Sequence, residues 1–311
     1  MVGESDNAGP LTPLRHAEHT LELGLIGNCQ IGALIDAQAR IVWCCLPRFD
    51  GDPFFSHLMD TQDRGYFSIE LQDLVGTRQY YQRNTAILCT ELTDKYGGRI
   101  RISDFCPRFN QFGRAFRPVA LVRRVEPLAG TPVIRVKLRP TSEYGTQTPD
   151  TTQGSHHIRY IGRNRITRLT TDASITYVQQ ESPIVLDGEL NFLLGPDESV
   201  TESVTTLCQR FHSETATYWH EWVRGLSIPF DWQHAVIRAA MTLKLSTFED
   251  TGAVIAAMTT SLPEAADSQR NWDYRYCWLR DAYFVVHALN RLGTTATMEN
   301  YLNYILNLVV G

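Results

Sequence analysis

The sequence predicts a multidomain α and β protein in which an antiparallel β-sandwich is followed by helices. Up to about residue 200, short segments alternate apolar and polar side chains between turn residues, and after it the apolar period lengthens to that of helices. The 311 residues, 43% of them hydrophobic, suffice for about two domains. We therefore divide the chain into a β domain over residues 1–200, a helical linker over 201–230 and a helical domain over 231–311.

The strand predictions rest on period-two alternation. In VIRVKLR (133–139) and GRIRISDF (98–105), Ile, Val and Leu alternate with Arg and Lys, as in strands with one wet face. The basic run RYIGRNRITRL (159–169) is interpreted as a solvated strand face, because Arg163 and Arg165 alternate with Asn164 and Ile166. Further strands between Gly, Pro, Asn and Asp clusters are predicted over 32–36, 40–46, 119–125, 175–180 and 190–194.

Four helices are predicted in the last third of the chain. Residues 202–226 form a polar helix with an aromatic stripe, suited to lying across a neighbouring surface. Residues 234–248 are apolar nearly all round, as in a helix enclosed on several sides. Two more helices are expected over 278–292 and 295–310, with Gly293 as the C-cap between them.

Charge and cysteine content exclude several classes of protein. With a net charge of −5 and a pI near 6.0, the chain has no broad positive electrostatic field that would attract nucleic acid or anionic lipid. We find neither a signal peptide nor an apolar run of membrane-spanning length. Seven cysteines without a Cys-x-x-Cys pair make neither a disulfide framework nor a zinc site, and His16 and His19 are interpreted as surface residues. We expect a cytoplasmic protein without cofactor, metal, nucleic-acid partner or membrane contact.

The stretch RNWDYRYCWLRDAYF (270–284) carries the candidate site. Arg280 and Asp281 lie where a helix is expected to begin, so both can point at one ligand. A carboxylate accepts from vicinal sugar hydroxyls, a guanidinium donates to them, and aromatic rings cover the apolar face of a pyranose. The alternative is a local ion pair between Arg280 and Asp281, with aromatic residues that belong to a core. From the residues alone, both interpretations stay open.

The motif NWDYRYCWLRDA resembles the signature of glycoside hydrolase family 15, which contains glucoamylases and a group of bacterial trehalases. Three more segments resemble the bacterial members in the same order: LIGNCQIGALIDAQARIVWCCLPRFDGDPFF, ISDFCP and MTTSLPE. One departure is Ala39, where the family often has Gly. The resemblance implies an N-terminal antiparallel super-β-sandwich, a helical linker and the start of an (α/α)6 barrel.

The resemblance also implies which residues contact the sugar. Tyr274, Trp278, Arg280 and Asp281 match the first-subsite residues, and Arg280 and Asp281 would hold the terminal glucose, including its hydroxyl at carbon 4. Trp272 and Tyr276 are weaker candidates with a packing role as the alternative.

The loop CLPRFDGDPFF (45–55) is a further candidate region. There, Arg48, Phe49 and Asp50 are possible leaving-group contacts, and the alternative is a structural turn built by Pro and Gly.

Catalysis by inversion requires a carboxylic acid and a carboxylate about 6.5–9.5 Å apart. In the family both are glutamates on later barrel loops, so no catalytic acid or base is expected among these residues. Glu299 matches neither position, and no spacing supports Glu264, Asp267 or Asp273 as substitutes.

The sequence therefore predicts a fragment of an exo-acting glucoamylase- or trehalase-type hydrolase that binds a glucose-containing oligosaccharide or disaccharide. The alternatives are a non-catalytic carbohydrate-binding or regulatory protein, or one part of a split enzyme. Because the helical domain carries wide apolar faces, with Met241, Leu245, Leu289, Leu302 and Val309 among them, we also expect self-association or a partner that completes the barrel.

Overall fold

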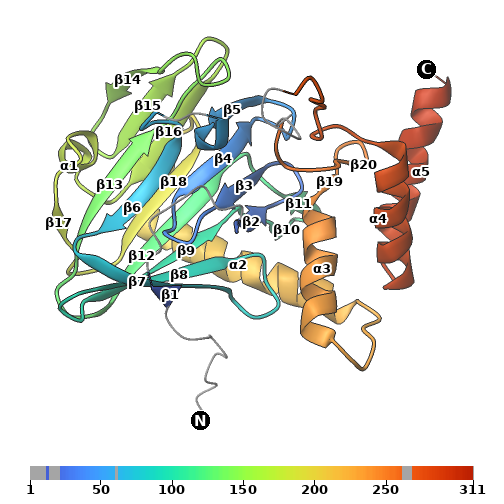
Figure 1. Cartoon of the computed structure of the whole chain (residues 1–311), viewed down its shortest axis with the longest axis horizontal. Coiled ribbons are helices and arrows are strands. Elements are labelled where there is room, and N and C mark those ends of the chain that lie inside the picture. The colour runs from blue at the N-terminus through green and yellow to red at the C-terminus, as the bar shows by residue number, and fades with distance from the viewer. Residues whose placement is uncertain (1–11, 14–21, 60–61, 261–267, 311) are drawn as a thin grey trace.

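The computed structural model describes residues 12–13, 22–59, 62–260 and 268–310. Figure 1 shows two large sheets with helices beside and behind them. In the first sheet the order is β1 (Thr12–Pro13), β7 (Leu74–Tyr81), β8 (Leu88–Asp94), β9 (Arg99–Phe105), β12 (Leu121–Ala129), β18 (Leu190–Pro196), β16 (Ile166–Thr171), β15 (His157–Ile161) and β14 (Asp150–Gln153). In the second it is β17 (Ile184–Val185), β13 (Val133–Arg139), β6 (Tyr66–Leu71), β4 (Ile41–Leu46), β3 (Gly32–Ile35) and β2 (Gly24–Gly27), and β5 (Asp52–Phe55) pairs with β4.

An apolar core shared by the two sheets holds this part of the chain together. Neighbouring strands pair antiparallel, and the pleat of each strand directs alternate side chains to opposite faces of its sheet. The inward side chains form one cluster, which includes Ile41 and Phe67 from one sheet and Ile102 and Phe192 from the other. This arrangement is consistent with the predicted β-sandwich, and the strands expected over 98–105 and 133–139 are confirmed.

Two local predictions in this region are wrong. Residues 175–180 were expected as a strand but form the helix α1 (Ile175–Gln179). Ile175 and Val178, three residues apart, are both buried while Tyr177 is 48% exposed, which is a helical and not a strand pattern. Residues 159–169 do not form one solvated strand face either: they make the β15–β16 hairpin, with Arg163 and Asn164 exposed in its turn and Arg165 partly buried.

Ala39, the departure from the family pattern, lies in the turn between β3 and β4. Ala39 is fully buried and has φ +59°, the left-handed region that glycine adopts without steric cost. The turn nevertheless forms, because Asp36 accepts hydrogen bonds from the backbone of Gln38 and Arg40 at 2.9 Å each. The carbonyl of Ala39 also accepts a hydrogen bond from Arg123.

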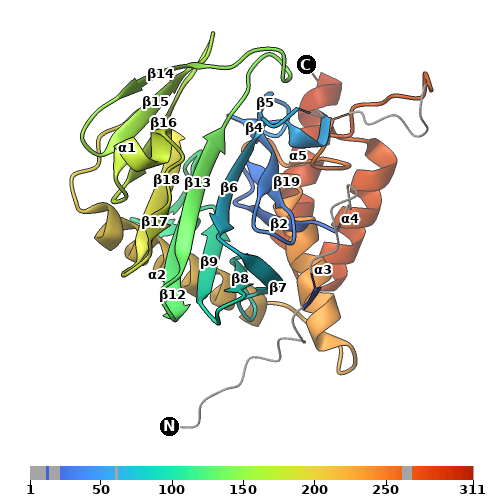
Figure 2. The same cartoon turned by 60° about the vertical axis from the view of Figure 1, so that its left-hand side comes forward.

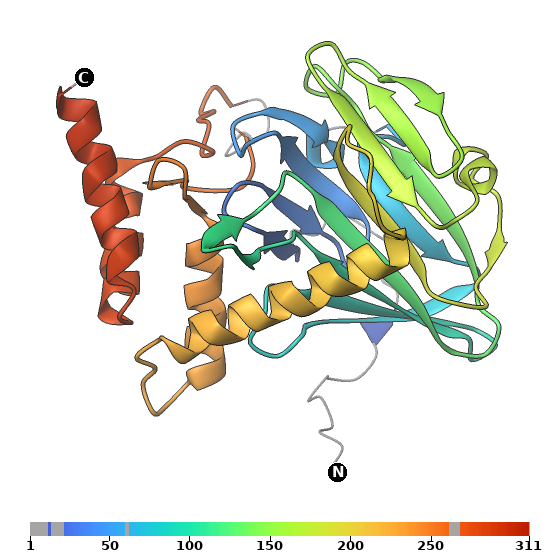
Figure 3. The ribbon, with the colours of Figure 1, turned by 180° about the vertical axis from the view of Figure 1, so that it is seen from behind.

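The helix α2 (Val204–Arg224) covers the outer face of the first sheet, as Figure 3 shows from behind. Ser203 caps its start, accepting a hydrogen bond from the Thr206 amide at 3.1 Å. The predicted aromatic stripe faces inward, with Phe211 and Trp219 buried. None of the helices in the described part of the chain is long and apolar enough to span a lipid bilayer.

The remaining helices are grouped on one side of the sheets (Figures 1 and 2). They are α3 (Gln233–Leu245), α4 (Leu279–Arg291) and α5 (Thr295–Val310), with two short strands, β19 (Thr247–Phe248) and β20 (Ala253–Val254), after α3. Short secondary elements elsewhere are η1 (His57–Met59), β10 (Phe109–Gln111) and β11 (Arg114–Phe116). The C-cap of α4 is Leu292, one residue before the predicted Gly293. Gly293 follows at φ +88°, and its amide donates to the Asn290 carbonyl at 3.0 Å.

The apolar faces of these helices are covered more than the sequence suggested. Met241 and Leu245 of α3 are buried against Leu25 of the sandwich and Trp219 of α2, and Leu289 of α4 is also buried. The expectation that these side chains stay uncovered is therefore wrong. It holds for α5, where Leu302 and Val309 are 51% and 78% exposed.

A buried charge cluster attaches the end of α3 to the sandwich. Arg108 donates to both carboxylate oxygens of Glu249 at 2.7 Å and to the Asn28 carbonyl at 2.7 Å. Lys244 also pairs with Glu249. Burial alone would raise the pKa of Glu249, but the charges of Arg108 and Lys244 outweigh it and lower the pKa from an ordinary 4.5 to about 2.

This cluster predicts an acid-sensitive contribution to stability. The pKa of Glu249 is lower in the folded protein than in the unfolded one. Its contribution of about 3 kcal/mol to the free energy of unfolding is therefore present above the unfolded pKa, and most of that contribution is lost as the pH falls to about 2.5. Urea unfolding at several pH values should show Glu249→Gln strongly destabilised at pH 7, with the difference from wild type shrinking towards pH 2.5. Glu214→Gln, at an exposed site on α2, should leave the pH profile unchanged. A wild-type to Glu249→Gln difference independent of pH would contradict the assignment.

Candidate carbohydrate-binding site

Arg275 is the centre of the hydrogen-bond network around the candidate site. It lies in the loop before α4, the signature loop (residues 272–278), and is only 3% exposed. Its guanidinium donates to the carboxylate of Asp273, with Nε to Oδ1 at 3.0 Å and Nη2 to Oδ2 at 2.7 Å. It also donates from Nη1 to the Gly51 carbonyl at 2.7 Å and from Nη2 to the Tyr144 hydroxyl at 3.0 Å. One side chain thus joins the loop to two segments of the sandwich.

The backbone of this loop is attached to the segment that follows α3. The amide of Ala257 donates to the Tyr274 carbonyl at 2.8 Å, and the amide of Ala256 donates to the Tyr276 carbonyl at 3.2 Å. That segment is in turn held to β4, because the indole of Trp43 donates to the Met258 carbonyl at 2.7 Å. The loop is therefore supported from both sides before α4 begins.

Tyr274 and Trp278 form an aromatic pair in front of the helix. Their ring centroids are 5.2 Å apart and their planes differ by 22°, so the rings are stacked. The Trp278 indole donates to the Asp273 carbonyl at 3.3 Å, and Trp278 is the extended N-cap residue of α4. Both side chains are half-buried, so each ring is supported and still partly accessible.

Arg280 and Asp281 lie in the first turn of α4, as predicted. Arg280 Nη2 donates to Asp281 Oδ2 at 3.2 Å, and the side chains are 74% and 40% exposed. The helix dipole favours the carboxylate at this end. An exposed pair of this kind contributes only about 0–1 kcal/mol to stability. Both groups are thus near each other, accessible and weakly engaged.

The possible leaving-group residues surround a small pocket next to Arg275. Arg48 and Asp50 pair through two hydrogen bonds of 3.0 Å, and Phe49 is 4% exposed with its ring edge on Phe248. Together with Tyr276, which is 53% exposed, they line a cavity of about 190 Å³. Trp272 is 43% exposed and does not line this pocket. The structure therefore brings the 48–50 turn and Tyr276 together across the chain.

The other acidic candidates have different positions. Asp273 is the counter-ion of Arg275; burial raises its pKa, but the hydrogen bonds and charge of Arg275 outweigh this and lower it. It is therefore ionised at neutral pH and already engaged. Glu299 is exposed on α5. Glu264 and Asp267, like His16 and His19, lie outside the described residues.

Sequence reasoning missed Arg275 and Tyr144. The only local signal is that Arg275 stands two positions from Asp273, which predicts a short-range pair but nothing about the sandwich. Its other partners, Tyr144 and Gly51, are 131 and 224 residues away along the chain. Such contacts follow from the tertiary fold alone.

Two family sequence models match the chain on either side of α2. The model described as "Trehalase-like, N-terminal" covers residues 15–182, and the one described as "Glycosyl hydrolases family 15" covers residues 232–310. The chain belongs to glycosyl hydrolase family 15. The second match contains the whole of the Arg275 loop and the first turn of α4.

The curated relatives of this family 15 chain include several archaeal and bacterial proteins named trehalase. That of Thermoplasma volcanium is 29% identical over an alignment of 302 residues that covers 92% of this chain and 47% of that protein. That of Thermoplasma acidophilum is 29% identical over 89% of this chain and 48% of that protein, and that of Mycobacterium tuberculosis is 40% identical over 30% of this chain and 14% of that protein. The chain spans about half the length of the curated relatives that it matches over most of its own length.

The network predicts that Arg275 is far more important for folding than the other arginine of the site. Arg275→Ala leaves the Asp273 carboxylate without its partner and should lower the free energy of unfolding by roughly 3 kcal/mol. Arg280→Ala, the same change at an exposed position, should cost less than about 1 kcal/mol. Urea denaturation measures both values, and hydrogen exchange should show lost protection at residues 253–260 and 272–278 in Arg275→Ala. Equal effects of the two substitutions would contradict the role of Arg275.

Proposed function

We propose that this chain supplies the terminal-glucose subsite of an exo-acting, inverting α-glucoside hydrolase of the trehalase type. The observation that carries the proposal is the stacked Tyr274–Trp278 pair directly before the exposed Arg280–Asp281 pair at the start of α4. Trehalose is favoured over longer glucans because the relatives that match most of the chain are named trehalases. A glucoamylase-type substrate is the second candidate.

The chemistry of the subsite follows from its exposure. Asp281 can accept hydrogen bonds from two neighbouring hydroxyls while Arg280 donates to an adjacent oxygen. In the described part of the chain, the guanidinium of Arg280 hydrogen-bonds to Asp281 alone, so several of its donors face solvent. A sugar would replace water around both groups without exposing a buried charge. The half-buried faces of Tyr274 and Trp278 would cover the pyranose ring.

The same contacts account for exo-action. A hydroxyl at carbon 4 held by Arg280 and Asp281 leaves no space for a chain that continues from that oxygen. Inversion additionally needs the acid and the base, which the family resemblance assigns to glutamates on barrel loops later than the signature. We therefore propose that α3, α4 and α5 are the first helices of an (α/α)6 barrel, and that residues 1–311 bind the sugar without cleaving it.

A neighbouring subsite for the leaving group is proposed at the pocket beside Tyr276. Arg48 and Asp50 present one paired guanidinium and carboxylate, and the cavity of about 190 Å³ has room for a single sugar ring or part of one. Phe49 is placed to support the turn from below, because it is buried against Phe248. Arg275, which belongs to the signature loop, forms another part of the wall of this pocket.

The proposal predicts sugar binding that depends on Asp281. Asp281→Ala should weaken binding of glucose and trehalose to the 311-residue chain by at least about tenfold, because each charge-assisted hydrogen bond contributes about 1.5–3 kcal/mol. Titration calorimetry measures the affinity, and an enzymatic glucose assay should detect no release from trehalose or maltose above background.

Asp231→Ala, an equal loss of charge at an exposed position, is the matched control and should bind like the wild type. Arg48→Ala should weaken trehalose binding while leaving glucose binding unchanged. Unchanged affinity in Asp281→Ala would refute the subsite assignment. Glucose release that persists through purification and disappears in Asp281→Ala would refute the claim that the acid and base lie elsewhere.

The exposed face of α5 predicts association of the chain. Leu302, Leu306 and Val309 are spaced to share one helix face and are 51%, 59% and 78% exposed, which leaves a contiguous apolar strip. We expect light scattering to show an apparent mass that rises with protein concentration. Leu306→Glu should reduce this rise, whereas Asn303→Glu, which adds the same charge at another exposed position of α5, should not. A wild-type monomer at all concentrations would contradict the prediction.

A further inference from the structure

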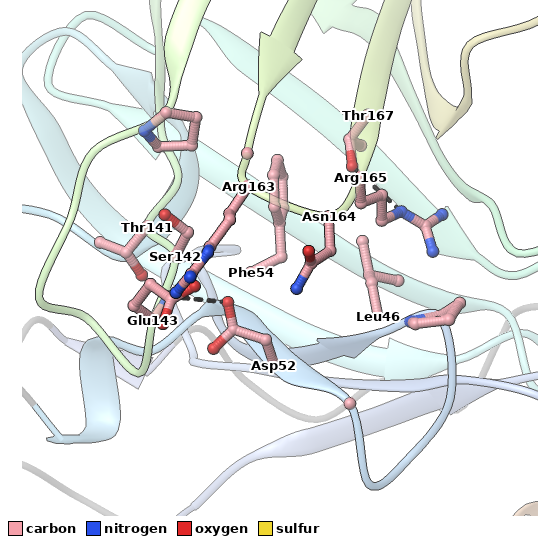
Figure 4. Close-up of a pocket in the computed structure, with 14 residues that line it drawn as sticks. Leu46, Asp52, Phe54, Thr141, Ser142, Glu143, Arg163, Asn164, Arg165 and Thr167 are labelled. Carbon is pink, nitrogen blue, oxygen red and sulfur yellow. Dashed lines mark hydrogen bonds between the residues drawn. The ribbon is translucent and has the colours of Figure 1, made fainter.

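A second pocket lies in the sandwich and is lined by other residues of the 46–52 turn than those that line the pocket beside Arg275. Its volume is about 360 Å³, and its walls come from the β4–β5 turn, the segment after β13 and the β15–β16 turn. Figure 4 shows the amide of Asn164 pointing into it towards Asp52, with Phe54 behind. Leu46 and Phe54, at 6% and 8% exposure, form an apolar floor beneath polar walls.

The charges around this pocket balance. Asp52 and Glu143 contribute two carboxylates, and Arg163 and Arg165 contribute two guanidinium groups. A pocket without net charge gives no advantage to a phosphate or another anion. An apolar floor with hydrogen-bonding walls, at the small end of the range of ligand pockets, suits a neutral molecule rich in hydroxyl groups.

Hydrogen-bonding groups remain available in the walls. Arg165 is partly buried, and this burial lowers the pKa of its guanidinium. In the described residues its hydrogen bond is from Nε to the Thr167 hydroxyl at 3.3 Å, which leaves both terminal nitrogens without a protein acceptor. The side-chain amide of Asn164 has no hydrogen-bond partner within the same described residues. The partly buried Arg165 and the exposed Asn164 therefore both have donors available to a ligand, and a ligand would satisfy those of Arg165 away from bulk water.

The walls of this pocket also hold Arg275. Asp52 accepts hydrogen bonds from the amides of Glu143 and Tyr144, each at 2.8 Å. The Gly51 carbonyl and the Tyr144 hydroxyl, directly beside these groups, accept from Arg275. Any ligand that contacts Asp52 and Glu143 therefore contacts the two segments that position the signature loop.

We propose that this pocket binds a neutral ligand of one or two sugar rings as a site separate from the signature, and that its occupancy stabilises the loop held by Arg275. Asn164 and Arg165 donate to the ligand hydroxyls, Glu143 accepts from them, and Phe54 lies under the ring. The site does not depend on sugar binding by Arg280 and Asp281. It would make the β domain a sensor of sugar concentration next to the subsite.

The test uses the Asp281→Ala chain, in which sugar binding at the signature subsite is weakened, with glucose and trehalose as probes. Saturation-transfer NMR should show saturable binding of at least one of them, and hydrogen exchange should show added protection in residues 46–54 and 160–167. Asn164→Ala and Arg165→Ala should each weaken this binding by about tenfold, since each removes donors to the ligand. Arg114→Ala, an exposed arginine on β11, is the matched control and should bind unchanged.

The coupling is tested in the same experiment. Sugar should slow amide exchange in residues 272–278 severalfold, and Asn164→Ala should abolish the effect. Asn164 lies in an exposed turn, so this variant keeps the proposal testable if Arg165→Ala disturbs the hairpin. No saturable binding of either sugar, preferential binding of inorganic phosphate, or full affinity in Asn164→Ala and Arg165→Ala would overturn the site. Binding without slower exchange at 272–278 would overturn the coupling.

Discussion

The guanidinium of Arg275 determines how the signature loop lies against the sandwich. A buried arginine cannot lose its charge and must find acceptors in the plane of its fork, so its partners are fixed in direction as well as distance. Here the acceptors are the Asp273 carboxylate, the Gly51 carbonyl and the Tyr144 hydroxyl, from three separate segments. A lysine could supply the charge but not this planar arrangement. Both pockets beside the loop share walls with these segments, so their shapes depend on this one group.

The Arg108 cluster applies the same principle at the other contact between sandwich and helices. Met241 and Leu245 provide the apolar burial there, but apolar packing tolerates sliding. The two hydrogen bonds from Arg108 to Glu249 and the one to Asn28 are directional, so they set the register of the segment after α3 on the sandwich. Because this segment pairs with the backbone at Tyr274 and Tyr276, the register set by Arg108 is passed on to the aromatic residues of the site.

The sequence predicts the elements whose signal is local. Period-two alternation identifies β9 and β13, and caps with helical periodicity identify α2, α4 and α5. It fails at 175–180, because a short run rich in Ile, Thr, Tyr and Val suits a strand, whereas burial of Ile175 with Val178 selects a helix. The sequence also does not predict the burial of Met241 and Leu245, because an apolar helix face does not indicate which neighbouring element covers it. At the site, the family resemblance supplies Asp281 and Trp278, but Arg275 and Tyr144 meet only in the folded chain.

Two arginines in the same short stretch have opposite environments, and this difference decides what each can do. Arg275 is 3% exposed and fully engaged, so a ligand could reach it only by breaking strong internal hydrogen bonds. Arg280 is 74% exposed and shares one hydrogen bond of 3.2 Å with Asp281, an interaction weak enough for sugar hydroxyls to replace. From the residues alone, a local Arg280–Asp281 ion pair and sugar binding are alternative interpretations. Because the pair in the structure is exposed and weak, the two are compatible. The pair holds a donor and an acceptor side by side, and the buried Arg275 network keeps the helix start beneath them in place.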